Sequence, residues 1–299
     1  MFDVIIVGSG ISAMTSAIYL ARSSKKVLML ECEQIGGAIA SSPRVENYPG
    51  IKSITGSNLA SNLYEQIENF GVEFKFEEAL NIKKNKDSFT VKTDTDSYKS
   101  KFVIIATGAK YRRLGLENEE DFVGNGESFC VACDGAFYNN KTVAVIGGGN
   151  SAIVNAISLS ENTKKLYIIQ NISKLTGEKS QVEKLKKKDN VEIIYDTVVT
   201  KLNGDDELES IEIENKDGKK VLKVDGIFVS IGQLPNNDLA KDLIELDDYG
   251  YIKVDNNCKT SIDGIYAIGD IRSKKIRQLT TSTADGTIAA ISIINELDK

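Results

Sequence analysis

Two stretches of the chain carry the same pattern of apolar and polar positions. Each begins with a short apolar run, passes through a glycine-rich turn into an apolar-periodic segment, and ends in a second apolar run. The stretches cover residues 4–31 and 143–170 and align at an offset of 139, which pairs Gly8, Gly10 and Ala13 with Gly147, Gly149 and Ala152. The pattern predicts two βαβ units of the dinucleotide-binding kind, in which a diphosphate binds backbone N–H groups at the start of the helix.

The two copies differ at their last residue. The first ends in Glu31 and the second in Gln170. A carboxylate at this position accepts hydrogen bonds from the ribose hydroxyls of adenosine. The alternatives are that each glycine turn serves packing alone and that Glu31 is a solvated strand end. Because both turns lie between a predicted strand and a predicted helix, the pattern favours a nucleotide site in the first copy.

Further elements extend the first copy into a larger unit. Gly36 and Gly37 follow it, and then come a turn at 47–50, a helix near 57–70, alternating strands over 73–98 and a strand over 102–108. The second copy belongs to a second unit that ends near residues 227–237. Residues 251–299, with a small-residue helix from Thr283, are too few for a domain and should return to the first unit.

The predicted fold class is therefore α/β, with two Rossmann-like three-layer dinucleotide-binding domains, the second inserted in the first. The first domain is discontinuous and covers 1–111 and 243–299, and the inserted domain covers 115–240. Two linkers between two domains favour a hinge.

Composition narrows the class of protein. The 299 residues are 41% hydrophobic, and no apolar stretch is long enough to span a membrane. Met1, Phe2 and Asp3 lead directly into a strand pattern without a basic leader, so we expect a cytoplasmic protein. The net charge of −6 argues against binding nucleic acid. Histidine is absent, so any proton transfer must use a carboxylate, thiol, lysine or water.

A close cysteine pair lies between the two glycine turns. Cys130 and Cys133 have the spacing of a reducible disulfide near a helix start, and a zinc site is the alternative. Asp134 follows the second thiol and is the natural proton carrier, although a helix N-cap would also explain it. Cys32 and Cys258 are interpreted as packing or surface cysteines.

With these motifs in place, the chain resembles the low-molecular-weight thioredoxin reductases over essentially its whole length. The shared segments, in the family's order, are residues 8–13, 46–50, 106–108, 130–135, 147–152, 264–270 and 277–279. The resemblance implies a homodimeric flavoprotein that holds FAD and reduces thioredoxin. It also implies that Cys133 lies nearer the flavin, that Cys130 attacks the partner disulfide and that Asp134 is the acid, with no metal involved. The implied FAD contacts are Gly8, Gly10, Ser12, Ala13, Glu31, Gly36, Gly37, Asn47, Thr107, Gly108, Gly269, Asp270, Arg277, Gln278 and Leu279.

The chain departs from the family after the second copy. Family members that use NADPH carry there a His-Arg-Arg motif followed by a further arginine, which holds the 2′-phosphate. Here residues 168–179 read IIQNISKLTGEK, and no arginine occurs from Leu114 to Ile271. Gln170 is also not the acid expected of an NADH enzyme. The chain has only six arginines, which accounts for part of this deficit, and Lys174 or Lys179 could meet a phosphate.

A subgroup of the family, from clostridia and some cyanobacteria, is similar in lacking this motif and takes electrons from reduced ferredoxin. The resemblance therefore implies transfer from ferredoxin through FAD and the Cys130–Cys133 disulfide to thioredoxin, without NADPH. The alternatives are an NADPH-dependent thioredoxin reductase and a flavin redox sensor without turnover. An acidic ferredoxin would need a basic patch, and the candidates are Lys110, Arg112, Arg113 and Lys184–Lys188. The last run could instead be a solvated helix face.

Overall fold

The chain divides at two points, between Lys110 and Tyr111 and between Gln233 and Leu234. The computed structural model describes residues 1–42 and 44–299. Unit 1 comprises Met1–Lys110 and Leu234–Lys299, and unit 2 comprises Tyr111–Gln233. The second division comes before the predicted end of the insertion at residue 240. The reason is that Ala240 and Ile244 are buried in the core of unit 1.

Unit 1 is built on a sheet in the order β3-β2-β1-β6-β5-β4, with β17 pairing β6. The strands β1, β2, β3, β6 and β17 run parallel, whereas β4 and β5 form an antiparallel ribbon with the first half of β6. The bounds are β1 (Phe2–Val7), β2 (Val27–Glu31), β3 (Glu73–Phe76), β4 (Ala79–Lys84), β5 (Phe89–Thr93), β6 (Ser97–Ile105) and β17 (Ile265–Ala267).

The strand predicted over 102–108 differs from the observed β6. It starts earlier because Ser97–Ser100 pair with β5. It ends at Ile105, and the chain turns at Gly108, whose φ of +71° lies in the left-handed region.

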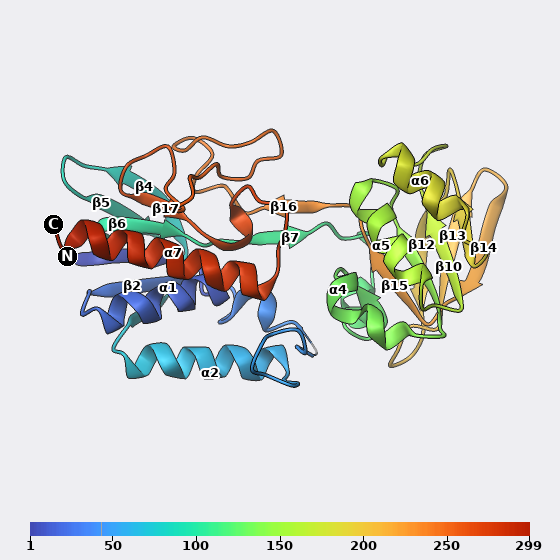
Figure 1. The fold of residues 1–299 in the computed structure, drawn as a ribbon, viewed down its shortest axis with the longest axis horizontal. Helices are drawn as coiled ribbons and strands as arrows, with labels where there is room; N and C mark the ends of the chain where they lie inside the picture. Colours follow the sequence, from blue (N-terminus) through green and yellow to red (C-terminus); the bar gives the residue numbers. More distant parts are fainter. Residues whose placement is uncertain (43) are drawn as a thin grey trace. The chain divides into compact units, whose positions relative to one another are not determined.

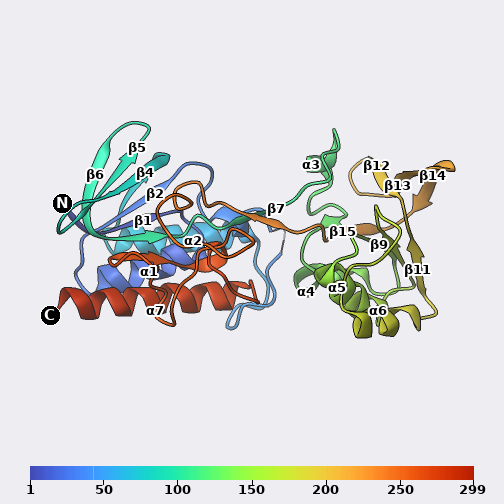
Figure 2. The same cartoon turned by 90° about the horizontal axis from the view of Figure 1, so that it is seen from above.

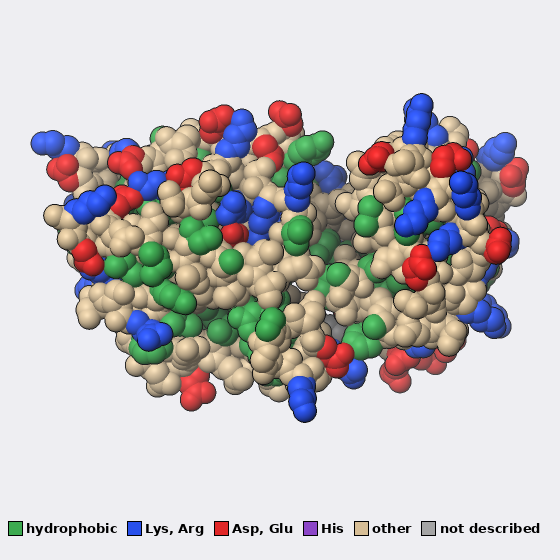
Figure 3. Space-filling model, viewed as in Figure 1, with side chains coloured by type: hydrophobic (Ala, Val, Ile, Leu, Met, Phe, Trp, Pro, Cys, Tyr) green, Lys and Arg blue, Asp and Glu red, His purple; other side chains and the backbone are tan. Residues whose placement is uncertain are grey.

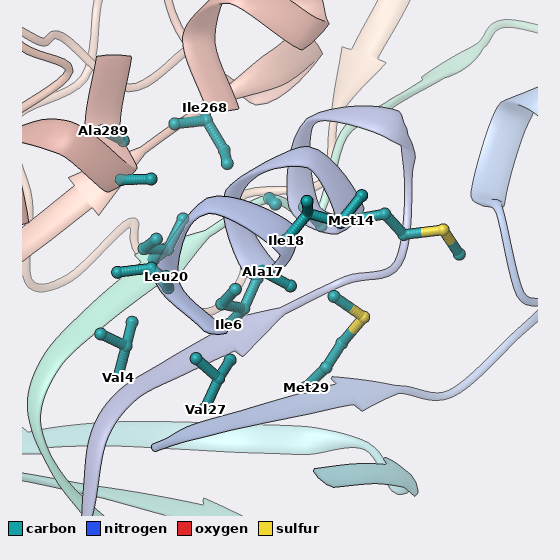
Figure 4. Close-up of a cluster of buried hydrophobic side chains, with 14 of the residues drawn as sticks. Val4, Ile6, Met14, Ala17, Ile18, Leu20, Val27, Met29, Ile268 and Ala289 are labelled. Carbon is teal, nitrogen blue, oxygen red and sulfur yellow. The ribbon is translucent and has the colours of Figure 1, made fainter. Parts of the chain in front are cut away.

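Three helices cover one face of this sheet, and α1 contacts both of the others (Figure 1). They are α1 (Ile11–Arg22), α2 (Gly56–Asn69) and α7 (Leu279–Leu297), with the short turns η1 (Gly37–Ile39) and η3 (Gly269–Ile271). Figure 4 shows Ala17 of α1 beside Ile6 of β1, and Met14 of α1 and Ala289 of α7 belong to the same apolar cluster. The helix predicted from Thr283 begins at Leu279 because Gln278 and Thr281 form a reciprocal capping box.

Unit 2 repeats this arrangement with its own elements (Figure 2). Its parallel sheet has the order β11-β10-β9-β15-β8, and a separate antiparallel sheet has the order β12-β13-β14. The strands are β8 (Glu127–Ser128), β9 (Thr142–Ile146), β10 (Lys165–Ile169), β11 (Val191–Ile194), β12 (Val198–Asn203), β13 (Ser210–Asn215), β14 (Gly218–Lys223) and β15 (Gly226–Val229). The helices are α3 (Glu119–Phe122), α4 (Val131–Asp134), η2 (Gly135–Tyr138), α5 (Asn150–Ser160) and α6 (Lys179–Lys186).

The predicted fold class is confirmed, since each unit has a parallel sheet between helices and an antiparallel layer. The sheet order β3-β2-β1-β6-β17 of unit 1 corresponds to β11-β10-β9-β15-β8 of unit 2. The corresponding end strands come from different parts of the chain. In unit 1, β17 comes last, whereas in unit 2, β8 comes first.

The two connections between the units are short strands that pair with each other, β7 (Ala109–Tyr111) and β16 (Gln233–Pro235). Among residues 1–42 and 44–299, the helices are all too short or too polar to cross a bilayer.

Candidate functional site

The first glycine turn leaves the start of α1 open. Gly8 has a φ of +105°, and a Cβ there would lie 2.4 Å from the carbonyl oxygen of Ala106, so a side chain is excluded. Gly10 is the N-cap of α1 without a side-chain cap bond, and no atom lies within 4 Å of where its Cβ would be. Ser12 and Ala13 are buried in the first helical turn. The N–H groups at this helix start can therefore receive an anion.

The Glu31 carboxylate is fixed by backbone and hydroxyl donors. Its Oε2 accepts from the backbone N–H of Ser9 (2.9 Å) and from Ser9 Oγ (2.6 Å). Its Oε1 accepts from the N–H groups of Cys32 (2.9 Å) and Glu33 (2.8 Å). Glu31 is thus an ordered carboxylate at the carboxyl end of β2 and not a freely solvated strand end. This is the position from which a ribose is held.

The second glycine pair lies against the first turn. Gly36 donates its N–H to Ser9 Oγ at 3.1 Å, and a Cβ on Gly37 would lie 3.7 Å from the Cα of Gly10. Ser9 therefore joins both glycine segments to Glu31. The sequence analysis missed this residue, and its signal is the serine between the glycines of the first turn.

Residues from the C-terminal segment reach the same helix start. A Cβ on Gly269, whose φ is +74°, would lie 2.5 Å from Ser12 Oγ. Leu279 packs in the apolar cluster that contains Ile11 of α1. Thr107 lies beside Gly8, since its N is 3.4 Å from the position of a Gly8 Cβ, and its Oγ1 donates to the carbonyl of Asn236 at 2.6 Å.

The remaining predicted contacts form a second part of the site. Asn47 Nδ2 donates to Gln278 Oε1 at 3.4 Å, and Arg277 Nε donates to the carbonyl of Asp270 at 3.3 Å. Arg277 also lies over the ring of Tyr251, 3.9 Å from its centroid. Gln278 caps α7, so one residue joins the helix start to the 47–50 turn.

A buried ionic cluster that the sequence analysis missed supports Gly269. Asp285 of α7 accepts the N–H of Gly269 at 3.1 Å and forms ion pairs with Arg272 (2.8 Å) and Lys274 (3.1 Å). Arg272 Nη1 also donates to Cys258 Sγ at 3.1 Å. Burial raises the pKa of the Cys258 thiol to about 11, so this cysteine is a packing residue of low reactivity.

These features fit FAD. An uncapped helix start can bind the diphosphate, Glu31 can meet the ribose, and the 47–50 and 269–279 segments converge on the same helix. Where bound, FAD would be held by these residues.

The second glycine turn differs from the first in the side chain that packs against it. Gly147 has a φ of +122° and Gly149 caps α5, as in the first copy. However, the buried Gln170 side chain lies against Gly148, where a Cβ would be 2.6 Å from Gln170 Cδ. Its Nε2 donates to the carbonyl of Lys174 at 3.1 Å. An amide thus packs on the turn at the position where unit 1 holds a carboxylate.

The loop after Gln170 folds over the same turn. Thr176 donates to the carbonyl of Gly148 from its backbone N (2.8 Å) and its Oγ1 (3.3 Å). Ile172 is 40% exposed, and Lys174 and Lys179 are also exposed. The exposed residues that follow β10 thus include neutral side chains and two lysines but no arginine.

The cysteine pair forms a disulfide at the start of α4. The Cα atoms of Cys130 and Cys133 are 5.2 Å apart. Cys130 is the N-cap of α4, and its carbonyl accepts the N–H groups of Cys133 (3.1 Å) and Asp134 (3.0 Å). Cys133 is exposed and Cys130 is half-buried. The two sulfurs are bonded to each other, which favours the redox interpretation over a zinc site.

Asp134 lies beside the disulfide, and its two carboxyl oxygens differ in their hydrogen bonding. Its Oδ2 accepts from Ser128 Oγ at 2.6 Å, whereas Oδ1 is buried without a hydrogen-bond partner among the described residues. Burial raises the pKa of Asp134, and the bond from Ser128 opposes this. Asp134 precedes η2 but makes no side-chain cap bond. The geometry therefore favours the acid over the helix cap.

A second buried carboxyl group lies on β8. In the described part of the chain, neither oxygen of Glu127 has a hydrogen-bond partner. The neighbouring Glu119 accepts the N–H groups of Leu114 (2.7 Å), Gly115 (2.7 Å) and Leu116 (3.3 Å). Burial, together with the charge of Glu119, raises the pKa of Glu127 to about 8. Glu127 is therefore largely protonated at neutral pH.

Most of the basic residues that are candidates for ferredoxin docking already form ion pairs or lie at a helix end. Lys110 pairs with Glu33, and Arg113 pairs with Glu120 at 3.3 Å, while Arg112 is exposed. The Lys184–Lys188 run covers the last turn of α6 and the residues after it, where positive charge is favourable to the helix dipole. Figure 3 shows basic and acidic side chains interspersed over unit 2. This placement favours the solvated helix face.

Comparisons with known proteins cover nearly the whole chain. The profile of the family described as pyridine nucleotide-disulphide oxidoreductase matches residues 2–286. A 34.2 kDa protein in the rubredoxin operon of Clostridium pasteurianum is 41% identical over 292 residues, covering 97% of this chain and 95% of that protein. Thioredoxin reductase of Peptoclostridium litorale is 36% identical over 300 residues, with coverage of 97% and 95%.

A solved structure is also similar throughout. The crystal structure of thioredoxin reductase from Streptococcus pyogenes MGAS5005 superposes with a TM-score of 0.96 at 39% identity, covering 100% of this chain and 98% of that one.

Proposed function

The chain belongs to the pyridine nucleotide-disulphide oxidoreductases and, within them, to the thioredoxin reductases, and on that premise we propose that its electron donor is reduced ferredoxin and not NADPH. Membership in this family implies that the protein binds FAD, uses a redox-active disulfide and reduces thioredoxin. A cytoplasmic location goes with this proposal, because thiol exchange of this kind runs in a reducing compartment.

The chemistry divides between the cofactor and the thiols. Bound FAD would accept electrons singly from ferredoxin and supply an electron pair to the disulfide. The pair breaks the Cys130–Cys133 bond and leaves two sulfurs that take up two protons. Asp134, with its pKa raised by burial, can deliver one of them.

Thiol exchange then returns the pair to its oxidised form. The Cys130 thiolate attacks the thioredoxin disulfide, which forms a mixed disulfide and releases one thioredoxin sulfur. The Cys133 thiolate next attacks Cys130 Sγ, which releases the second thioredoxin sulfur and re-forms the Cys130–Cys133 bond. The two protons from the enzyme thiols end on thioredoxin.

The observation that carries the choice of donor is the lack of arginine in residues 170–179 after β10, where the two basic side chains are Lys174 and Lys179. NADPH differs from NADH by a 2′-phosphate, which arginines hold bidentately. Here Asn171, the exposed Ile172 and Thr176 stand in that segment, and the hydroxyl of Thr176 is engaged by Gly148. Gln170 supplies no carboxylate for an NADH ribose. The Clostridium pasteurianum relative belongs to a rubredoxin operon, which fits a one-electron protein donor.

The donor is tested by anaerobic stopped-flow at the flavin absorbance of the purified FAD protein. We expect reduced ferredoxin to bleach the flavin completely and NADPH, up to millimolar concentration, to leave it oxidised. Rapid and stoichiometric bleaching at micromolar NADPH would instead make this an NADPH-dependent enzyme with an unusual phosphate site.

A gain-of-function variant sharpens this test. The triple variant Asn171→Arg, Ile172→Arg and Thr176→Arg places guanidinium groups at exposed positions of the loop. If the frame of unit 2 is intact, NADPH should now reduce the flavin at a measurable rate. The matched control carries glutamine at the same three positions and should stay unreactive, since it changes size and polarity without adding charge.

We further propose a homodimer through α7. The exposed residues Ala284, Ile288, Ile291 and Asn295 recur at helical spacing, and the two isoleucines are 39% and 44% exposed. A second copy of the chain would cover this stripe. The double variant Ile288→Asp and Ile291→Asp should be monomeric by size-exclusion chromatography with light scattering, whereas Asn62→Asp, at an exposed position of α2 outside the stripe, should keep the wild-type mass. A wild-type protein that is monomeric at micromolar concentration would contradict the proposal.

A further inference from the structure

Ser128 lies between the Cys130–Cys133 disulfide and the Asp134 carboxyl group. It lies on β8 with 6% of its surface exposed, two residues before Cys130. Its Oγ donates to Asp134 Oδ2 at 2.6 Å and accepts the backbone N–H of Cys130 at 3.1 Å. One hydroxyl therefore connects the acid to the backbone of the attacking cysteine.

The bond fixes which oxygen of Asp134 is available. Oδ2 is occupied by Ser128, while Oδ1 is buried and has no partner in the described part of the chain. A buried carboxyl oxygen without a partner is unfavourable unless it carries or exchanges a proton. The orientation set by Ser128 thus leaves one oxygen for proton transfer.

The surroundings contain few other groups that could set the protonation of Asp134. From η2, Tyr138 faces it, and burial keeps the pKa of that phenol high, at about 12. The packed elements α5, β9 and β15 carry no titratable side chain in their sequences. Ser128 is therefore the main polar neighbour besides the sulfurs.

We propose that Ser128 is a positioning residue of the disulfide chemistry, which orients Asp134 for proton transfer and couples it to the Cys130 backbone. This inference rests on the proposed reductase function. When an electron pair opens the disulfide, two thiolates form, and Asp134 protonates one of them and becomes a carboxylate that regains its proton from solvent. Ser128 stays hydrogen-bonded throughout and donates to the carboxylate when it forms.

The bond has a defined consequence for pH dependence. Donation from Ser128 stabilises the carboxylate more than the acid, so it lowers the pKa of Asp134. A rate that needs the protonated acid falls as pH rises through that pKa. Without the hydroxyl, the falling limb should move to higher pH by about one unit, and the plateau rate should drop by about tenfold because the orientation is lost.

The test compares wild type with Ser128→Ala, Ser128→Thr and Asp134→Asn in the FAD-loaded full-length protein. One arm follows thioredoxin reduction against pH. The other starts from the oxidised protein and follows the opening of the Cys130–Cys133 disulfide by dithiothreitol, at a fixed concentration of the reagent's thiolate, through acid quenching, alkylation and mass spectrometry. The second arm needs neither ferredoxin nor thioredoxin. If the proposed function is wrong, wild type shows no thioredoxin turnover in the first arm, and the second arm still tests the role of Ser128.

We expect Ser128→Ala to show the shifted limb and lowered plateau in the dithiothreitol arm, and Ser128→Thr to restore both. Asp134→Asn should lose the limb, and adding Ser128→Ala to it should change nothing further. A loss of rate in Ser128→Ala that is equal at every pH would mean that the serine only supports the fold and would overturn the inference. If Ser128→Ala does not fold, a Ser128→Thr profile identical to that of Asp134→Asn would overturn it equally.

Discussion

Replacing Cys133 by serine should convert the enzyme into a trap for its partner. The remaining Cys130 is half-buried at the start of α4 and can still attack a thioredoxin disulfide. No second thiol would then be present to resolve the mixed disulfide, so turnover should fall on the order of a thousandfold or more. Incubation with oxidised thioredoxin after reduction should give a covalent one-to-one adduct, visible by mass spectrometry and cleaved by dithiothreitol.

The matched variant is Cys130→Ser. It should lose turnover to the same degree but accumulate much less adduct, since the exposed Cys133 is proposed to face the flavin. Adduct formation with the opposite preference would reverse the assigned roles of the two cysteines. Cys32→Ser, which removes an exposed thiol of unit 1, should leave both turnover and adduct formation as in wild type.

Stability should fall with rising pH because of Glu127. Its pKa is about 8 in the folded protein, well above the ordinary value of 4.5, because it is buried beside Glu119. Below pH 4.5 the group is protonated in both states. Between this value and about 8 the unfolded chain ionises and the folded one does not. The folded state therefore loses about 1.4 kcal/mol per pH unit across this window, a few kcal/mol in total.

The comparison that isolates this effect is Glu127→Val against wild type. From pH 5 to pH 8, the urea midpoint of Glu127→Val should rise relative to that of wild type. Above pH 8 the difference between the two midpoints should level off. Glu120→Gln is the control, since that carboxylate lies on the same short helix as Glu119 but is 77% exposed and should shift the midpoint little at any pH. Parallel curves for valine and wild type would show that Glu127 is ionised in the folded state.

Amide exchange at Leu114–Leu116 should follow the same pH dependence, because Glu119 holds those N–H groups.

The sequence predicted those parts of the fold that repeat a local pattern. The two βαβ copies, the first glycine turn and the Cys130–Cys133 pair all lie in short stretches where spacing decides the structure. Boundaries decided by tertiary contacts were less accurate. The second unit ends at Gln233 because the following segment is buried in unit 1, and α7 starts at Leu279 because of a capping box that residue type alone did not reveal.

The supporting polar residues were not predicted. Ser9, Ser128 and Asp285 each act through hydrogen bonds to site residues, and neither composition nor periodicity indicates such bonds. Asp285 in particular is an acid inside a helix of small residues, and its role depends on the approach of Gly269, Arg272 and Lys274 in the folded chain. The position of Gln170 on Gly148 likewise depends on the packing of a loop and not on the repeat.

The different origins of the two corresponding end strands bear on how the protein is made. Because β8 precedes the other strands of its sheet, every strand of unit 2 lies within the continuous segment Tyr111–Gln233. Unit 1 needs β17, which is translated after every strand of unit 2. On the ribosome, the disulfide-bearing unit can thus complete its sheet while its host still lacks a strand and the α7 helix. The FAD site draws on residues 269–279, so it can form only after the whole of unit 2 has been translated.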